Sequence, residues 1–290
     1  MSAEAEGRAA AEHFRREHRL GMQPLGDLVA IIEQTTSIDV AVLDVGPDEH
    51  GLTMRDPLRG IVFIGVARTR NPMRQRSTLA HELGHVLFED WVPDNASDWS
   101  ERKPAEIRAD AFARHLLVPL DDLREFVEPR ARRTSVTQAD LSAVVQRFLV
   151  SPAIAAIALC QAGYLDNATK SEWKSVSTPR LAGRFGWSDQ YHALQADSDR
   201  QRAPQRLLAR AISGYAEGVL SAQTIATLRG IPLEVAEAEL REAGIEPPEH
   251  PIAWTDSADL PDVRVDLQEL DDDLNLPEND HRTVPERDAR

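Results

Sequence analysis

Two histidines four residues apart, with a glutamate directly after the first, are the residues whose types and spacing could most clearly do chemistry. They are His81, Glu82 and His85 in the stretch HELGH. An α-helix advances about 100° per residue, so both histidines would share one helical face and could bind one metal ion. Glu82 would lie beside that ion and could take a proton from a water molecule that the ion activates. The spacing predicts a metal centre with Glu82 as its catalytic acid/base.

A catalytic zinc ion needs three protein ligands and one open position, so a third ligand must lie elsewhere. The stretch EIRADAFARHLLVP supplies Glu106 and Asp110, four residues apart on one face of an expected helix. We expect Glu106 to bind the metal and Asp110 to accept a hydrogen bond from the second ring nitrogen of a ligand histidine. Glu101 is a weaker alternative ligand, because it precedes this helix. His115, nine residues after Glu106, should point away.

Other assignments rest on residue type alone. Two imidazoles and one carboxylate suit zinc, although manganese could occupy the same ligands. An oxyanion could be stabilised by Arg74, Arg76 or Tyr164, and the sequence does not choose among them. The remaining histidines lie in separate segments without ligand spacing and are expected at the surface: His13, His18, His50, His192, His250 and His281.

Helices and short strands must position these residues. Asn71 and Pro72 are typical of a helix start and predict a helix through HELGH to about Phe88. Other helices are expected over about 3–18, 25–35, 104–118 and 120–127. Strands are expected over about 38–45, 50–56 and 60–66. Turn residues separate the three strands, which favours a small antiparallel meander.

Beyond Pro129 the pattern is helical. Two segments that begin at Leu141 and Leu220 share a layout of helix, proline-containing turn and helix, which indicates a loose internal repeat of helix-turn-helix shape. The segment 166–202 contains Trp173 and Trp187 but no clear period. We expect that segment to be a loop with partial order.

These elements predict an α+β fold. It comprises a metallopeptidase-like core of helices and a small antiparallel three-stranded sheet, followed by all-helical, helix-turn-helix-like modules. We place the core at 1–130, a first helical module packed on it at 131–165, and a second at 166–248. An acidic tail at 249–290, expected to be disordered, would complete the chain.

Composition restricts the class of protein. The 290 residues carry a net charge of −15, and the last fifty contain 15 acidic and 5 basic residues. Such a balance, with no strongly basic stripe, does not favour nucleic-acid binding. No segment approaches the roughly 18 apolar residues of a membrane span, and the N-terminus is too charged for a secretory signal. The single cysteine fits a reducing cytoplasm, where we expect the protein to reside.

The two motifs, RQRSTLAHELGHVLF and EIRADAFARHLLVP, together resemble the ImmA/IrrE family of metallopeptidases, whose fold is zincin-like. The resemblance reaches to about residue 165, and more loosely to 248. It implies that His81, His85 and Glu106 are the metal ligands and that Glu82 is the catalytic acid/base. Family members usually have asparagine where Asp110 stands. They usually have an aromatic residue where Ser77 stands, and neither departure removes a ligand.

The resemblance also implies a biological role. Family members are typically cytoplasmic, site-specific endopeptidases that cleave a helix-turn-helix repressor of the XRE type, often in response to DNA damage or for a mobile element. The residues themselves support part of this expectation. A strand at about 60–66, just before the HELGH helix, could present an edge to an extended substrate segment.

Two other classes of function remain open from the sequence. The helix-turn-helix-like repeats could make the chain a DNA-binding regulator, although their second helices, AIAAIALCQAG and LEVAEAELREAG, lack the basic residues that contact phosphates. The chain could also be an inactive binding module, for example a toxin–antitoxin partner. All the expected catalytic positions are present, which favours the peptidase.

Overall fold

The computed structural model describes residues 2–46, 51–91, 104–131 and 135–248. These residues form one compact unit that extends to Pro248. The expectations for the acidic tail at 249–290, for Glu101 and for His50, His250 and His281 lie outside the described residues.

Helix α3, Pro72–Leu87, carries the HELGH stretch and begins as predicted. The side chain of Asn71 accepts a hydrogen bond from the backbone N–H of Arg74, and Pro72 occupies the first turn, where its missing N–H costs nothing. The helix buries Leu79 and Leu83 in the main core. Both histidines are therefore presented by a well-anchored helix.

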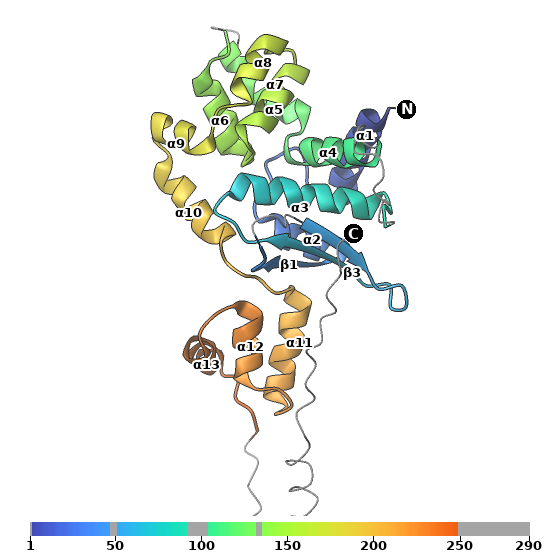
Figure 1. Cartoon of the computed structure of the whole chain (residues 1–290), viewed down its shortest axis with the longest axis vertical. Coiled ribbons are helices and arrows are strands. Elements are labelled where there is room, and N and C mark those ends of the chain that lie inside the picture. Colours follow the sequence, from blue (N-terminus) through green and yellow to red (C-terminus); the bar gives the residue numbers. More distant parts are fainter. Residues whose placement is uncertain (1, 47–50, 92–103, 132–134, 249–290) are drawn as a thin grey trace, which may run out of the picture. The chain divides into compact units, whose positions relative to one another are not determined.

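Helices and the sheet are arranged in layers around α3 (Figure 1). Helix α4, Pro104–Leu117, packs along one side of α3, and the three-stranded sheet lies on the other. Helix α1, Ala3–Glu17, packs on α4 and approaches it closely at Gly7, where a Cβ atom would lie 2.2 Å from the Arg108 carbonyl oxygen. Helix α2, Leu28–Thr36, packs on the first strand and on α3. The core lies mainly between these layers.

The sheet is mixed, so the predicted antiparallel meander is wrong. Its strands are β1, Asp39–Leu43, β2, Gly51–Arg55, and β3, Val62–Ala67, in the order β1-β3-β2. Strand β3 pairs parallel with β1 and antiparallel with β2. The physical reason is that the two apolar strands, β1 and β3, both bury their middle residues and pair with each other, whereas a meander would separate them by β2. Most residues of β2 are exposed, which suits an edge.

Helices α5 to α10 follow α4, and the last three of these lie where the sequence predicted a loop. Helices α5, Leu120–Ala131, α6, Gln138–Phe148, and α7, Pro152–Gln161, were expected, although α5 continues past Pro129. Segment 166–202 forms α8, Asn167–Trp173, α9, Thr178–Phe185, and α10, Ser188–Ser198. The predicted partly ordered loop is therefore wrong.

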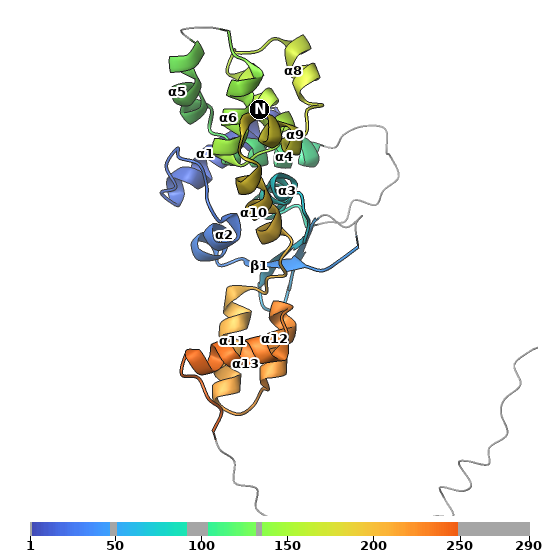
Figure 2. The same cartoon turned by 90° about the vertical axis from the view of Figure 1, so that its left-hand side faces the viewer.

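The helices of segment 166–202 are short, and tertiary contacts hold them. Trp173, Trp187 and Tyr191 are buried in the main core. The indole N–H of Trp187 donates a 2.9 Å hydrogen bond to the hydroxyl of Ser142 on α6. Helix α10 then returns beside α3 (Figures 1 and 2), where the hydroxyl of Ser198 donates to the Thr69 carbonyl.

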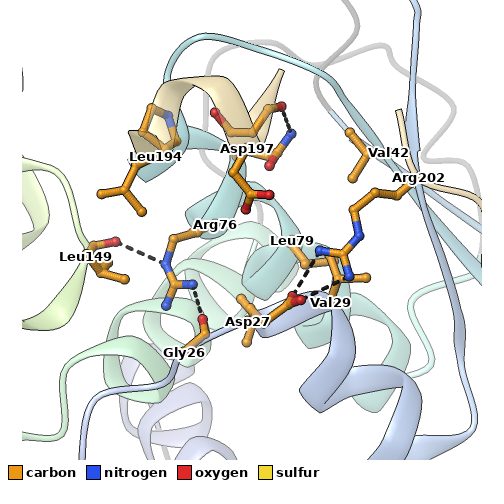
Figure 3. Close-up of a pocket in the computed structure, with 14 residues that line it drawn as sticks. Gly26, Asp27, Val29, Val42, Arg76, Leu79, Leu149, Leu194, Asp197 and Arg202 are labelled. Atoms are coloured by element: carbon orange, nitrogen blue, oxygen red, sulfur yellow. Dashed lines mark hydrogen bonds and ion pairs between the residues drawn. The ribbon is translucent and has the colours of Figure 1, made fainter. Parts of the chain in front are cut away.

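Arg76 ties distant segments to α3. Its guanidinium donates hydrogen bonds to the carbonyl oxygens of Leu25, Gly26 and Leu149, so it joins the start of α2 and the turn between α6 and α7 (Figure 3). The same pocket contains Arg202, whose side chain pairs with Asp27. Arg76 is thus engaged in holding the fold together.

The last three described helices have a small core of their own. They are α11, Gln205–Ala216, α12, Ala222–Arg229, and α13, Leu233–Glu242, and they bury Ala211, Ala222, Ile225 and Leu240 against one another. Gly230 has a φ of 62° at the end of α12 and allows the tight turn into α13. Among the described residues no single helix is long and apolar enough to cross a membrane; α6 and α7 reach that length only together and are bent by 108°.

Candidate metal centre

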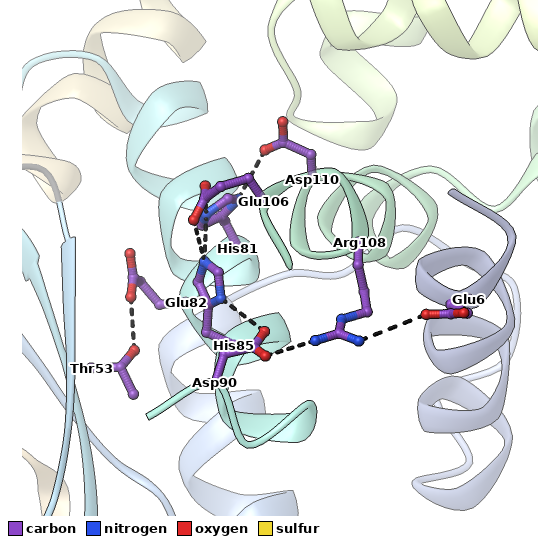
Figure 4. Close-up of polar contacts among 9 residues, drawn as sticks. All are labelled: Glu6, Thr53, His81, Glu82, His85, Asp90, Glu106, Arg108 and Asp110. Atoms are coloured by element: carbon purple, nitrogen blue, oxygen red, sulfur yellow. Dashed lines mark hydrogen bonds and ion pairs between the residues drawn. The ribbon is translucent and has the colours of Figure 1, made fainter. Parts of the chain in front are cut away.

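Helices α3 and α4 bring the three expected ligands together (Figure 4). The Nε2 atoms of His81 and His85 are 3.0 Å apart. Glu106 places one carboxylate oxygen 3.3 Å from Nε2 of His81 and the other 3.4 Å from Nε2 of His85. The histidine side chains are 20% and 15% exposed, whereas that of Glu106 is 48% exposed. The donors therefore converge at a position that solvent can reach.

The spacing of these donor atoms fits a metal ion. Four ligands placed tetrahedrally at zinc bond lengths of 2.0–2.1 Å lie roughly 3.3–3.4 Å from one another. The three observed separations are 3.0, 3.3 and 3.4 Å. The two distances to Glu106 involve different carboxylate oxygens, and one ligand atom of each residue lies within 4.8 Å of the others, so His81, His85 and Glu106 are placed to share one ion.

Asp110 lies where the sequence analysis expected it. Its Oδ1 atom is 2.9 Å from Nδ1 of His81. A neutral imidazole that donates from Nδ1 keeps its lone pair on Nε2, the atom that faces Glu106. Helix α4 therefore supplies both Glu106 and the acceptor that orients His81.

A second carboxylate, which was not predicted from the sequence, faces His85. The Oδ2 atom of Asp90 lies 3.2 Å from Nδ1 of His85. Arg108 of α4 donates a 2.7 Å hydrogen bond to the other oxygen of Asp90, and its guanidinium lies over the ring of Phe88. Both histidines consequently have a carboxylate behind them.

Glu82 follows His81 directly, about 100° round α3, and its side chain is turned towards the sheet (Figure 4). Its Oε2 atom accepts a 2.7 Å hydrogen bond from the hydroxyl of Thr53 on β2. Gly51 lies on the same face of β2, and a Cβ atom there would lie 2.7 Å from the Thr78 methyl group and 2.8 Å from Oε1 of Glu82. The absence of a side chain at Gly51 therefore leaves room for the Glu82 carboxylate.

The other sequence-based candidates lie elsewhere. His115 is 5% exposed and faces α1, with Nε2 3.5 Å from Glu4, so it points away from the ligands as predicted. Burial, together with the charge of Arg114, lowers the pKa of His115 to about 4. Arg76 binds backbone carbonyls, and Tyr164 packs against the main core, so both are engaged away from the three ligands.

Spacing rules explain why Asp90 and Thr53 were missed. Asp90 follows His85 by five residues, but it lies beyond the end of α3, so helical periodicity does not pair them. Thr53 is 29 residues from Glu82 in sequence and belongs to a strand. Strand alternation could have placed Gly51 and Thr53 on one face, but only the sheet's position shows which element that face contacts.

Comparison with known proteins agrees with this geometry. The family model of the IrrE N-terminal-like domain, Peptidase_M78, matches residues 35–159, which include the sheet, α3 and α4. A search of curated proteins gave no match. Residues 35–159 are therefore similar to the ImmA/IrrE family of metallopeptidases, in agreement with the two motifs.

Proposed function

We propose that the chain is a zinc-dependent endopeptidase in which His81, His85 and Glu106 bind the metal and Glu82 is the catalytic acid/base. The convergence of two Nε2 atoms and one carboxylate within 3.0–3.4 Å carries this proposal. Three protein ligands of this type leave a coordination position open for water or substrate, as catalytic zinc sites require. Manganese could occupy the same ligands.

Glu82 and Thr53 have different roles in hydrolysis. A bound metal ion supplies Lewis acidity, which polarises a peptide carbonyl and acidifies water. Glu82 takes a proton from the attacking water and delivers it to the amine nitrogen as the C–N bond breaks. The hydroxyl of Thr53 holds Oε2 of Glu82, which leaves Oε1 as the proton acceptor.

Strand β2 is the edge that we propose for the substrate. From the sequence we expected the strand at about 60–66 to present an edge to the substrate. That strand, β3, is central and has no open edge. β2 is an edge strand, and its Thr53 contacts Glu82 directly. The opposite edge of the sheet, at β1, already pairs with Arg202 through Val42. An extended segment added to β2 would therefore lie next to the catalytic glutamate.

The substrate that we infer is a helix-turn-helix repressor of the XRE type, whose cleavage would derepress stress or mobile-element genes. The similarity of residues 35–159 to the ImmA/IrrE family supports this choice. The helical modules after residue 131 also favour recognition of one partner over general digestion, because they enlarge the surface next to the catalytic helices. We expect the reaction to take place in the cytoplasm.

Co-expression tests the proposed function directly. The full chain and a Glu82→Gln variant are each expressed with the helix-turn-helix repressor encoded by the neighbouring gene, and the repressor is analysed by intact-mass spectrometry. We expect one specific cut with the wild type and none with the variant. Cleavage by both proteins would overturn the role of Glu82. Cleavage by neither, with zinc bound to the wild type, would overturn the substrate assignment.

DNA binding is the second candidate function, and the helix pairs do not favour it. Helix α7 is largely buried in the main core, so it is not free to enter a groove. Helix α13 carries Glu234, Glu237, Glu239 and Glu242, which would repel phosphates. A gel-shift titration at low salt separates the alternatives, since tight duplex binding there would favour a DNA-binding regulator. A catalytically inactive, toxin–antitoxin-type binding module would instead bind the repressor without cutting it.

A further inference from the structure

The end of α3 places Asp90 behind His85 by a defined helix-capping geometry. Glu89 has a φ of 56°, its backbone N–H donates to the Val86 carbonyl, and the backbone N–H of Asp90 donates to the His85 carbonyl. These two bonds form a Schellman motif, in which the second residue after the cap contacts the third residue from the helix end. That contact is usually apolar. Here it joins the Asp90 carboxylate to the His85 imidazole, 3.2 Å apart.

Arg108 fixes the position of the Asp90 carboxylate. Each oxygen of Asp90 has its own partner: Oδ2 faces His85, and Oδ1 accepts a 2.7 Å hydrogen bond from Arg108. The guanidinium of Arg108 lies 4.4 Å from the centre of the Phe88 ring, and its other terminal nitrogen lies 3.7 Å from Glu6 on α1. The side chains of Asp90 and Arg108 are only 19% and 25% exposed, so solvent screens this pair weakly.

Helix α4 therefore reaches both ligand histidines. Asp110 contacts His81 directly, and Arg108 contacts His85 through Asp90 (Figure 4). Glu106 approaches both rings from the same helix. Every donor of the centre is consequently held in place from α4, even though the two histidines belong to α3.

We propose that Asp90, held by Arg108, is a positioning residue for the metal centre: it accepts the Nδ1–H of His85 and so directs the Nε2 lone pair at the metal. This inference rests on the proposed metal-binding function. Asp90 contacts neither metal nor substrate in this arrangement, and it acts through His85. Carboxylates behind ligand histidines typically change metal affinity by roughly 10–100-fold.

Zinc affinity of the full-length chain tests the proposal. The metal-free protein is titrated with zinc against a chromogenic chelator, for the wild type and for Asp90→Ala, Asp90→Asn and Glu89→Gln. We expect Asp90→Ala to lose roughly 10–100-fold in affinity. Asp90→Asn should lose less, because the amide oxygen still accepts a hydrogen bond. Glu89→Gln is the matched control, since it removes the charge of an exposed carboxylate one residue away but keeps the side-chain shape at the helix cap, and it should bind zinc like the wild type.

A second measurement detects the tautomer of the His85 imidazole. Long-range ¹H–¹⁵N spectra of the metal-free protein, with His85 assigned from a His85→Ala variant, should show the Nδ1–H tautomer in the wild type and a mixture in Asp90→Ala. This signature does not depend on activity, and a loss of stability alone would not produce it. Circular dichroism confirms that each variant is folded. If Asp90→Ala is not folded, Asp90→Asn replaces it in this measurement.

The outcomes separate this inference from the proposed function. Equal zinc affinity in the wild type and Asp90→Ala would overturn the positioning role and leave the metal centre standing. Equal losses in Asp90→Ala and Glu89→Gln would also overturn it, because they would reveal only a general charge effect. A wild-type chain that does not bind zinc at all would refute the proposed function itself.

Discussion

The side of α3 that faces α4 and the side that faces β2 differ in how their polar groups are held. On the α4 side, His81 and His85 each have a carboxylate behind them and share Glu106 in front. On the sheet side, Glu82 is held by a single hydroxyl, that of Thr53, on an edge strand. The ligand side is rigidly supported, whereas the acid/base is coupled to the strand that we propose receives the substrate.

This difference predicts that metal affinity and turnover can be changed separately. Changes on the α4 side should act first on metal affinity, and changes on the sheet side should act on turnover at saturating metal. Four substitutions test the separation, with the repressor-cleavage assay and the zinc titration as the two measurements.

Glu106→Gln should have the largest effect. It removes an anionic ligand while it conserves size, so zinc affinity should fall by more than the roughly 10–100-fold typical of a residue behind a ligand, and cleavage should be lost with it. Glu125→Gln, an exposed position on α5, is the control and should leave both measurements unchanged. Normal zinc affinity in Glu106→Gln would exclude Glu106 as a ligand.

Glu82→Gln should show most clearly that turnover can change while zinc affinity does not. Turnover should fall by about 10²–10⁴-fold, the usual contribution of a general acid–base residue, because the amide does not accept a proton from water. Zinc affinity should be unchanged, since Glu82 is not one of the three donors and its Oε2 atom is hydrogen-bonded to Thr53. A loss of zinc from this variant would show that the two sides of α3 are not independent.

Asp110→Asn should have a moderate effect on affinity. The hydrogen bond to Nδ1 of His81 becomes a neutral one but is kept, because the amide oxygen still accepts it. Zinc affinity should therefore fall by less than the roughly 10–100-fold expected when the acceptor is lost, while turnover at saturating zinc should change much less. Comparing dissociation constants with turnover at excess zinc distinguishes these effects. A fall in turnover alone would place Asp110 among the groups that act on the substrate.

Thr53→Val should have the smallest effect, and on turnover only. Valine keeps the branched shape and removes the hydroxyl that holds Oε2 of Glu82. Turnover should fall by about 10-fold, the scale of one hydrogen bond to a charged group, with no change in zinc affinity. Thr53→Ser, which keeps the hydroxyl, should restore most of the activity. Failure of serine to do so would assign the effect to packing on β2.

The reliability of sequence reasoning differed between the helices and the sheet. Helix α3 was predicted closely, because Asn71 and Pro72 are local signals that act within one turn. The order of the strands depends on the parallel pairing of β1 with β3, which the turn residues between consecutive strands do not reveal. The helices of segment 166–202 are held by Trp173, Trp187 and Tyr191 in a core that the segment does not itself contain.

The candidate site shows the same division. The sequence by itself determined the two histidines on one helical face, the glutamate beside them, and the pair Glu106 and Asp110 on a second helix, because helical periodicity fixes which residues share a face. Only the tertiary structure decided that Asp90 and Arg108 lie behind His85 and that Thr53 holds Glu82. These contacts join a helix end, a neighbouring helix and an edge strand, and their geometry arises only when separate elements pack together.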